Sequence, residues 1–420
     1  MEVRPGYKQT EVGVIPEDWA VWSLGEIGES LIGLTYHPSD VRSYGTLVLR
    51  SSNVQENKLR FDDNVFVDTD IPDRIMVRPG DILVCVRNGS RDLIGKSALI
   101  DDRAIGMTFG AFMAVFRSEQ GELLHQMFQS EIIKNQINEH LGATINQITN
   151  KSLNSFRVPL PPTNDERRAI ASALSDMDAL LVALEQLVVK KRALKQAAMQ
   201  QLLTGQSRLS GFHGEWEVRP LSSVIAGLDA GVSVNSVEHS MPLRSGEPCI
   251  LKTSAIFDGC FDPEECKLIE RRDINRARLS PRRDTIIISR MNTPNLVGEV
   301  GYVADDFPTL NLPDRLWLTR FDPNSDICAR WLAYVMSSAK VKERIKGLAT
   351  GTSGSMKNIG KDKLLALQLE FPTGEEQTAI ATVLSDMDAE LAALEQRLAK
   401  TRALKQGMMQ ELLTGRTRLV

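Results

Sequence analysis

The sequence is poor in cysteine and histidine, and neither residue forms a site pattern. Five cysteines are scattered over 420 residues, and none belongs to a Cys-x-x-Cys pair. A disulfide framework or a zinc site is therefore not expected, whereas reduced, buried thiols are. The five histidines show no His-Glu-x-x-His spacing and no triad-like context, so the usual signatures of zinc hydrolases and nucleophile triads are absent. No metal site is expected.

Long apolar runs and glycine-rich loops are also missing. The apolar runs fall far short of the ~20 residues that span a bilayer, and the first residues hold no signal-peptide core, so we expect a cytoplasmic protein. No Gly-x-Gly pair and no Asn/Asp-Pro-Pro-aromatic tetrapeptide occurs. These absences remove the usual dinucleotide and S-adenosylmethionine loops and the amino-methyltransferase motif. A self-sufficient methyltransferase would need both of these missing motifs.

A strong charge of one sign is not present either. The net charge is −4, with 16 basic and 21 acidic residues in 1–158 and 22 basic and 20 acidic residues in 208–368. Neither segment is a general polyanion binder. Binding to nucleic acid would have to use a local basic face.

What the sequence does contain is a long internal repeat. Residues 162–209 recur at 372–419 with a constant offset of 210, and 31 of 48 positions are identical. Both copies include Leu-Ser-Asp-Met-Asp-Ala and end near Leu-Leu-Thr-Gly. The segments before each copy do not repeat in this way. The chain therefore duplicates its connectors and varies what they connect.

Each copy of the repeat has the pattern of a long amphipathic helix. Apolar residues follow a spacing of four and three residues, which is typical of a helix–helix seam. After a polar interruption at Lys191 and at Thr401, the stripe is expected to resume. The predicted seam consists of Ile170, Leu174, Met177, Leu181, Leu184 and Leu194 in the first copy and Ile380, Leu384, Met387, Leu391, Leu394 and Leu404 in the second.

The ends of both helices are also encoded. Thr163-x-x-Glu166 and Thr373-x-x-Glu376 match the capping-box pattern. Gly205 and Gly415 stand where a left-handed cap belongs. Helices of about 40 residues are ~60 Å long. Packing of each helix on its own globular domain is one alternative. The narrow stripe favours two helices that pair antiparallel about a pseudo-twofold axis.

The variable segments are predicted to be mixed α/β domains. Strand-like runs occur at 47–49, 81–86 and 285–289, between turn residues. The two segments share a faint plan, in which a strand leads to Arg87-Asn88 or Arg290-Met291-Asn292 and a polar loop follows later, at 142–150 or 351–358. We therefore expect an α+β fold with two such domains joined by a coiled coil, over 1–160, 161–207, 208–370 and 371–420.

Basic and polar side chains near these strands are the candidate DNA contacts. Arginine suits phosphate and guanine, and Ser, Thr and Asn loops reach phosphates or base edges. A solvated, neutralised face is the alternative for any single arginine, and ordinary domain-closing loops are the alternative for the polar segments. The candidates are Arg87, Asn88, Arg91, Lys96, Thr149 and Lys151 in the first domain and Arg271, Arg272, Arg282, Arg283, Arg290, Asn292, Ser353, Ser355 and Lys357 in the second.

Several of these segments together resemble the specificity subunit of type I restriction-modification systems. The resemblance is carried by segments 6–19, 289–302, 312–317 and 351–359 and by the Pro-x-x-x-Glu-x-x-x-Ile helix starts at 162 and 372. The order of domain, helix, domain and helix carries the resemblance further than any one motif. One departure is Glu166-Arg167, where the second copy keeps the family's Glu376-Gln377.

The resemblance implies a non-catalytic DNA reader. Each target-recognition domain would read one half of a bipartite site, and the helices would fix the unread spacer. Two modification subunits would dock on the helices and carry S-adenosylmethionine, and restriction subunits would join and use ATP. No cofactor is expected in this chain itself. The alternative from another class is a coiled-coil scaffold that presents two peptide- or ligand-binding domains.

Overall fold

The computed structural model describes residues 4–142, 147–238, 246–351 and 356–419. The chain forms two compact units, residues 1–186 with 396–420 and residues 187–395. The boundaries between the units fall inside the two long helices. Each unit therefore holds one segment of each long helix as well as one globular domain.

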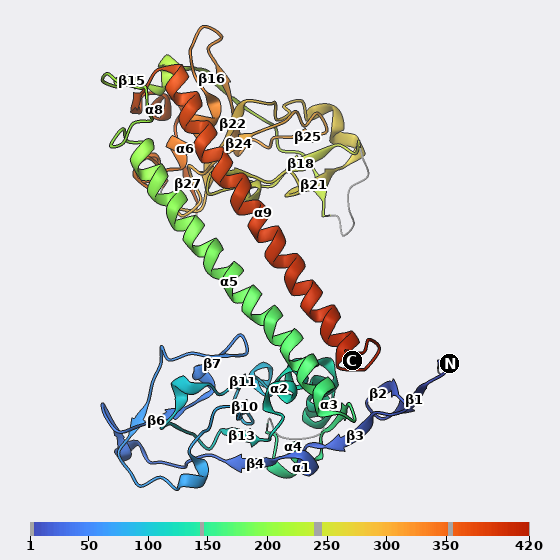
Figure 1. Cartoon of the computed structure of the whole chain (residues 1–420). Helices are drawn as coiled ribbons and strands as arrows, with labels where there is room; N and C mark the ends of the chain where they lie inside the picture. Colours follow the sequence, from blue (N-terminus) through green and yellow to red (C-terminus); the bar gives the residue numbers. More distant parts are fainter. Residues whose placement is uncertain (1–3, 143–146, 239–245, 352–355, 420) are drawn as a thin grey trace. The chain divides into compact units, whose positions relative to one another are not determined.

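The first unit is built around two small four-stranded sheets (Figure 1). Its strands are β1 (Tyr7–Thr10), β2 (Gly13–Pro16), β3 (Ala20–Ser23), β4 (Glu29–Ile32), β5 (Val41–Arg42), β6 (Thr46–Leu49), β7 (Val54–Gln55), β8 (Lys58–Leu59), β9 (Phe66–Val67), β10 (Ile82–Cys85), β11 (Ser97–Leu99), β12 (Thr108–Phe109), β13 (Met113–Arg117) and β14 (Arg157–Leu160). Its helices are α1 (Leu24–Ile27), α2 (Gly121–Gln129), α3 (Glu131–Gly142), α4 (Asn150–Ser155) and the start of α5 (Asn164–Leu202).

Strand β10 explains how these sheets pack. The antiparallel sheet has the order β11-β10-β13-β4, and the other has the order β12-β6-β9-β5, with β12 parallel to β6. Ile82 and Val84 enter the core beneath α2 and α3, while Leu83 and Cys85 enter the core shared with the other sheet. Both faces of β10 are buried, so its sequence is a continuous apolar run.

The second unit contains a matching set of elements (Figure 1). Its strands are β15 (Glu217–Pro220), β16 (Ile225–Ala230), β17 (Ser236–Val237), β18 (Cys249–Leu251), β19 (Ile256–Phe257), β20 (Cys260–Phe261), β21 (Cys266–Ile269), β22 (Thr285–Ser289), β23 (Met291–Asn292), β24 (Val300–Val303), β25 (Leu310–Asn311), β26 (Leu316–Phe321), β27 (Lys357–Asn358) and β28 (Gln368–Phe371). Its helices are α6 (Ala329–Ser337), α7 (Ala339–Gly347), α8 (Lys361–Leu365) and the start of α9 (Gly374–Leu412).

The two units share one topology. The sheet β16-β26-β22-β24 repeats β4-β13-β10-β11, and β17-β21-β18-β25 repeats β5-β9-β6-β12. The parallel pair recurs between β18 and β25. The two-stranded antiparallel pair β15-β28 repeats β3-β14. The α+β expectation is confirmed, and the faint sequence plan reflects a real duplication of the domains.

The long helices enter the cores of both units. Ile170 and Leu174, near the start of α5, share a core with Leu412 at the end of α9. In the second unit, Ile380 and Leu384 share a core with Leu202. These residues correspond through the repeat offset. The helix ends therefore pack on the globular domains, which was the alternative to helix pairing. Within each unit the two helices also pack against each other.

The helix caps are only partly as expected. The hydroxyl of Thr163 accepts from the backbone N–H of Glu166, and Thr373 does the same for Glu376. In a full capping box the glutamate side chain would bind the backbone N–H of the cap residue. Here the side chains of Glu166 and Glu376 each bind an arginine of the opposite helical repeat instead. Gly205 and Gly415 both have a φ of 69°, the left-handed conformation expected past a helix end.

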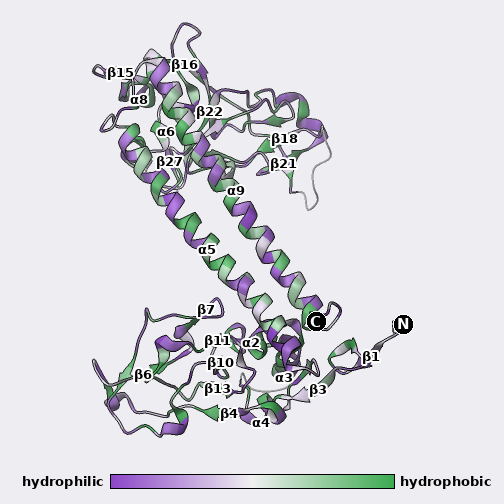
Figure 2. Cartoon of the chain, viewed as in Figure 1, coloured by the Kyte–Doolittle hydropathy of each residue, from purple (hydrophilic) through white to green (hydrophobic). Residues whose placement is uncertain are grey.

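The seam differs from the prediction in the second half of each helix. Leu194 is 48% exposed and Leu404 is 58% exposed, so neither lies on the buried face. Thr401 and Lys405 are buried instead, each 8% exposed. The four-three spacing continues without interruption through Thr401 and Lys405. The prediction from the sequence placed Leu404 on the seam instead. Figure 2 shows apolar and polar residues alternating along both helices.

The cysteines are free thiols. Cys85, Cys249 and Cys266 are buried and Cys260 is exposed. Burial raises the pKa of the Cys249 thiol to about 12, so this group behaves as a small apolar side chain. In the described part of the chain, no helix is both long enough and apolar enough to cross a membrane.

Candidate nucleic-acid interface

The first domain joins two segments that the sequence singled out separately. Arg87, just past the end of β10, forms an antiparallel bridge with Gln147 of the polar loop. The N–H of Ile148 donates to Val86, which fixes this pairing. The guanidinium of Arg87 is exposed and lies 5.3 Å from the ring of Phe112.

The second domain repeats this junction. β23 pairs with β27, so that Met291 faces Asn358 and Asn292 faces Lys357. The N–H of Ile359 donates to the carbonyl of Arg290. Backbone geometry therefore makes Arg290 the counterpart of Val86, and Met291 the counterpart of Arg87. In both domains the strand exit and the polar loop form one surface.

The candidate DNA contacts of the first domain differ in exposure and in the hydrogen bonds that they already make. Arg91 is exposed and donates to the carbonyl of Asn138, and Lys96 is half-buried. Asn88 donates to Ser51 at 3.4 Å. The hydroxyl of Thr149 caps α4, accepting from the N–H of Ser152 at 3.1 Å. Lys151 is exposed on the first turn of the same helix.

The arginine cluster of the second domain is divided by the fold. Arg282 and Arg283 precede β22, whereas Arg290 follows it, so the strand separates them by roughly 15 Å. Arg283 lies 3.9 Å from Asp284. Arg290 is half-buried, with its guanidinium 5.6 Å from the ring of Trp317. These residues do not form a single basic patch.

Arg271 and Arg272 lie on the 3₁₀ helix η8 (Arg271–Arg276). Both side chains are exposed, and Arg272 pairs with Glu270 at 2.9 Å. Asp273 anchors this turn, because the N–H of Asn235 and the guanidinium of Arg276 both donate to it. These donors, the Asn235 backbone first, lower the pKa of Asp273 to about 2.

The remaining predicted residues are on β23 and β27. Asn292 is buried, and its amide donates to the hydroxyl of Ser289 at 3.2 Å. Lys357 is half-buried and donates to the carbonyl of Gly351. Ser353 and Ser355 lie outside the described residues.

The sequence reading missed a polar cavity in the second domain. The cavity has a volume of about 540 Å³ and is lined in part by Ser233, Lys252, Lys267 and Arg315. Both lysines pair with Glu238, at 3.3 and 2.8 Å. Donors and acceptors therefore alternate on its wall. No spacing signal marks these residues, because they come from separate turns and strands.

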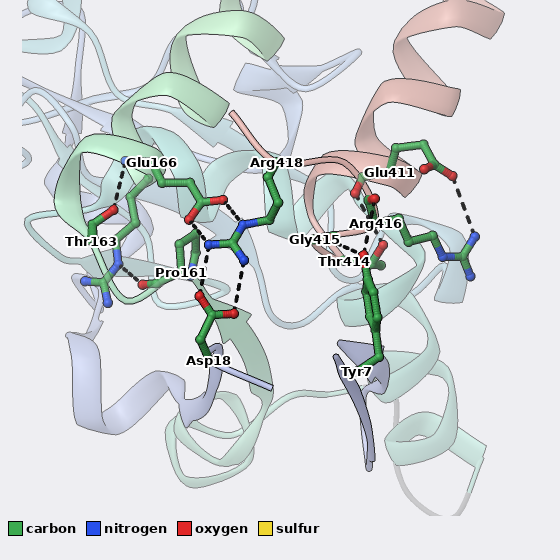
Figure 3. Close-up of polar contacts among 11 residues, drawn as sticks. Tyr7, Asp18, Pro161, Thr163, Glu166, Glu411, Thr414, Gly415, Arg416 and Arg418 are labelled. Atoms are coloured by element: carbon green, nitrogen blue, oxygen red, sulfur yellow. Dashed lines mark hydrogen bonds and ion pairs between the residues drawn. The ribbon is translucent and has the colours of Figure 1, made fainter. Parts of the chain in front are cut away.

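The helices of the first unit are clamped by the end of the chain (Figure 3). Arg418 donates to both carboxylate oxygens of Glu166, at 2.5 and 2.8 Å, and to both oxygens of Asp18, at 3.0 Å each. The hydroxyl of Tyr7 donates to the carbonyl of Gly415 at 3.3 Å. Glu166 is 1% exposed, so Arg418 supplies the charge that a buried carboxylate needs.

Two further ion pairs join α5 and α9 in the first unit. Lys405 lies 2.7 Å from Asp178, and Arg402 lies 2.8 Å from Glu185. As the residue number rises along α5, the number of its partner on α9 falls. The two segments therefore run antiparallel in this unit.

The second unit contains the same three ion pairs with the helices exchanged. Arg208 binds Glu376, Lys195 binds Asp388, and Arg192 binds Glu395. Every one of these residues is the repeat counterpart of a residue in the first set. Identical contacts in both units set one register for the antiparallel helices.

A buried histidine lies beside the Lys405–Asp178 ion pair of the first unit. His125 on α2 is 7% exposed and close to Gln129, Asp178 and Lys405. Burial, opposed by Asp178 and assisted by Lys405, lowers the pKa of His125 to about 4. The imidazole is therefore neutral near pH 7.

Two sheet domains of one topology, each packed on segments of the long helices, define the class of internally duplicated, modular proteins. Residues 16–195 match the family model described as the type I restriction modification DNA specificity domain.

Curated relatives extend this likeness to almost the whole chain. The chain is 24% identical to the specificity subunit of the type I restriction enzyme EcoKI of Escherichia coli K12, over 96% of this chain and 89% of that protein. It is 23% identical to the StySPI specificity subunit of Salmonella potsdam, over 96% and 90%. The chain is therefore similar to type I specificity subunits over almost its whole length.

Solved structures show the same fold. The S subunit of a type I restriction-modification system from M. genitalium aligns with a TM-score of 0.60 and 13% identity, covering 98% of both chains. A chain from a study of complex assembly and conformational transition of the type I R-M system aligns with a TM-score of 0.53 and 17% identity, covering 96% of this chain and 99% of that one.

Proposed function

We propose that the chain is a type I specificity subunit and that each of its two domains reads one half of a bipartite DNA site. The helices α5 and α9 set the length of the unread spacer and bind two modification subunits, which carry S-adenosylmethionine and methylate adenine. Restriction subunits that use ATP complete the assembly. The chain itself contributes recognition and no catalytic group.

The exchanged ion pairs carry this proposal. Arg418–Glu166 and Arg208–Glu376 are the same contact made twice, as are Lys405–Asp178 and Lys195–Asp388. A register defined in both units supports a helix pair of fixed length. A fixed length is what a spacer ruler requires, because joining two readers rigidly makes the second half-site contact intramolecular.

An exposed stripe of leucines on α5 supports docking of a helical partner. Leu180, Leu187 and Leu194 are seven residues apart and are 38%, 37% and 48% exposed. Leu404, the counterpart of Leu194 on α9, is 58% exposed. Apolar residues at heptad spacing form the seam that another helix covers. We infer that the modification subunits contact this face.

The scaffold alternative, with two peptide- or ligand-binding domains, is not favoured by the relatives. A specificity subunit also explains why the constant part of the chain is helical and the divergent part is globular. Readers must change when the target changes, while a docking surface must keep the same partner.

The test is to express the chain with a type I modification subunit in cells and sequence the methylome. The proposal predicts adenine methylation within a two-part motif whose halves are separated by a constant number of unread bases. Methylation at a continuous motif would contradict it, as would binding of the purified complex to DNA without sequence preference.

A further inference from the structure

Two positions at the strand exits are equivalent in the two domains but carry exchanged side chains. The first position is Arg87 in one domain and Met291 in the other, as the pairing with Gln147 and Asn358 shows. The second position is just before β13 or β26 and is occupied by Phe112 or Arg315.

Backbone hydrogen bonds establish the second equivalence. The N–H of Val86 donates to the carbonyl of Phe112 at 3.1 Å, and the N–H of Arg290 donates to the carbonyl of Arg315 at 3.1 Å. The strand registers agree, because Cys85 pairs with Met113 as Ser289 pairs with Leu316. The two positions therefore lie beside each other in each domain.

Each domain thus presents one arginine next to one large apolar side chain. In the first domain the arginine follows β10, and in the second it directly precedes β26. Both domains keep an arginine beside a large apolar residue, but the two residue types occupy opposite positions. This pattern indicates that the pair is kept for binding and not for packing.

Packing does not account for these side chains. Phe112 is 61% exposed, although a free aromatic surface is costly to leave in water. Arg87 is exposed, and its guanidinium lies over the ring of Phe112. Arg315 is exposed, has no ion-pair partner among the described residues, and lines the polar cavity. Met291 is half-buried.

We propose that these pairs, Arg87 with Phe112 and Arg315 with Met291, are the base-reading residues of the two half-sites. The proposal rests on the proposed DNA-reading function. In each pair, the arginine donates to O6 and N7 of a guanine in the major groove, and the apolar side chain contacts the methyl group of a neighbouring thymine. In the second domain, the lysines and hydroxyls of the cavity beside Arg315 surround the same base step.

The cavity supports this assignment for the second domain. Its lining combines the lysines Lys252 and Lys267 and the hydroxyls of Ser233 and Thr253 with the carboxylates of Glu238 and Asp314. Such a mixture of donors and acceptors matches base edges and sugar–phosphate oxygens. Asp314, next to Arg315, accepts a hydrogen bond from the hydroxyl of Ser233.

The experiment uses the full chain in complex with a type I modification subunit and DNA libraries in which each half-site is randomised in turn. Methylation frequency then gives the base preference at every position. The variants Arg87→Lys and Arg315→Lys keep the charge but lose the two-pronged contact with guanine. Arg103→Lys and Arg320→Lys are matched controls, since these exposed arginines pair with Asp101 and Asp229.

The expected result is local to one half-site. Arg315→Lys should lower the preference for guanine at one position of the second-domain half by about tenfold to a hundredfold, with the other half unchanged. Arg87→Lys should do the same in the first-domain half. Phe112→Ala and Met291→Ala should each lower the thymine preference at a neighbouring position by about fourfold.

Each contrary outcome identifies its cause. If Arg87→Lys and Arg315→Lys leave base preferences as unchanged as the controls do, the reading pair is overturned. Uniformly weaker binding of Arg87→Ala and Arg315→Ala, with a smaller dependence on salt, would make these residues phosphate contacts and would also overturn it. If the wild-type complex shows no two-part motif, the proposed function itself fails. Melting temperatures of all variants verify folding.

Discussion

Arg418 donates hydrogen bonds to both carboxylate oxygens of Glu166, although the two residues are 252 positions apart in the sequence. The end of α9 is thereby fixed to the start of α5 in the first unit. Arg208 holds Glu376 in the second unit in the same way. The same contact, made once in each unit, joins the two copies of the helical repeat.

Removing the clamp should destabilise the first unit. Arg418→Ala leaves Glu166 buried without its charge partner, and we expect a loss of about 2 kcal/mol in the free energy of unfolding, less than for a fully buried pair because Arg418 is partly exposed. Arg416→Ala, whose partner Glu411 is 3.8 Å away at the surface, should cost at most about 0.5 kcal/mol. Chemical denaturation measures both. Equal effects would show that the clamp has no structural role.

The seam ion pairs should respond to charge exchange. Lys405→Asp places a second carboxylate beside Asp178 and should lower the melting temperature. Adding Asp178→Lys restores an attractive pair and should recover most of that loss. The counterpart pair Lys195 and Asp388 should behave alike, because it makes the same contact in the second unit. A double variant less stable than the single Lys405→Asp variant would contradict the pairing.

His125 should make the first unit sensitive to acid. Its folded-state pKa of about 4 is below the unfolded value of 6.5, so the unfolded state takes up a proton first as the pH falls. Stability is complete above pH 6.5 and declines toward pH 4, by at most about 3 kcal/mol from this group. His125→Asn should flatten the profile of unfolding free energy against pH in that window. An unchanged slope would exclude a role for His125.

The exposed leucines should be needed for partner binding and not for folding. Replacing Leu180, Leu187 and Leu194 by Gln should reduce copurification of a modification subunit while leaving the melting temperature unchanged. The control changes Ala179 and Ala193 to Gln, one position away on the same helix. If both sets bind the partner equally well, the docking face lies elsewhere.

The sequence predicted the organisation of the fold well and the details of the site less well. The repeat, its caps and the runs at 81–86 and 285–289 identify the long helices and the buried strands, because periodicity and apolar content are local properties. Leucine side chains favour a helix–helix seam, so the sequence alone predicts Leu194 and Leu404 there, although both are exposed. Lys195 and Lys405 are used instead, since each meets a carboxylate of the other helix.

The surface of each domain was harder to predict. Arg282 and Arg290 are close in sequence but are separated by β22 in the fold. Phe112 and Arg315 gave no signal, because their importance depends on which strand exit lies beside them. Their equivalence appears only when the hydrogen bonds of the two domains are compared.

The most direct test of the account is a domain exchange. Residues 208–368 are replaced by the corresponding segment of a relative with a different target, and the methylome of cells carrying this chain and a modification subunit is sequenced. The account predicts that one half of the motif changes, while the other half and the spacer length stay the same. A change in both halves, or in neither, would contradict the assignment of one reader to each half-site.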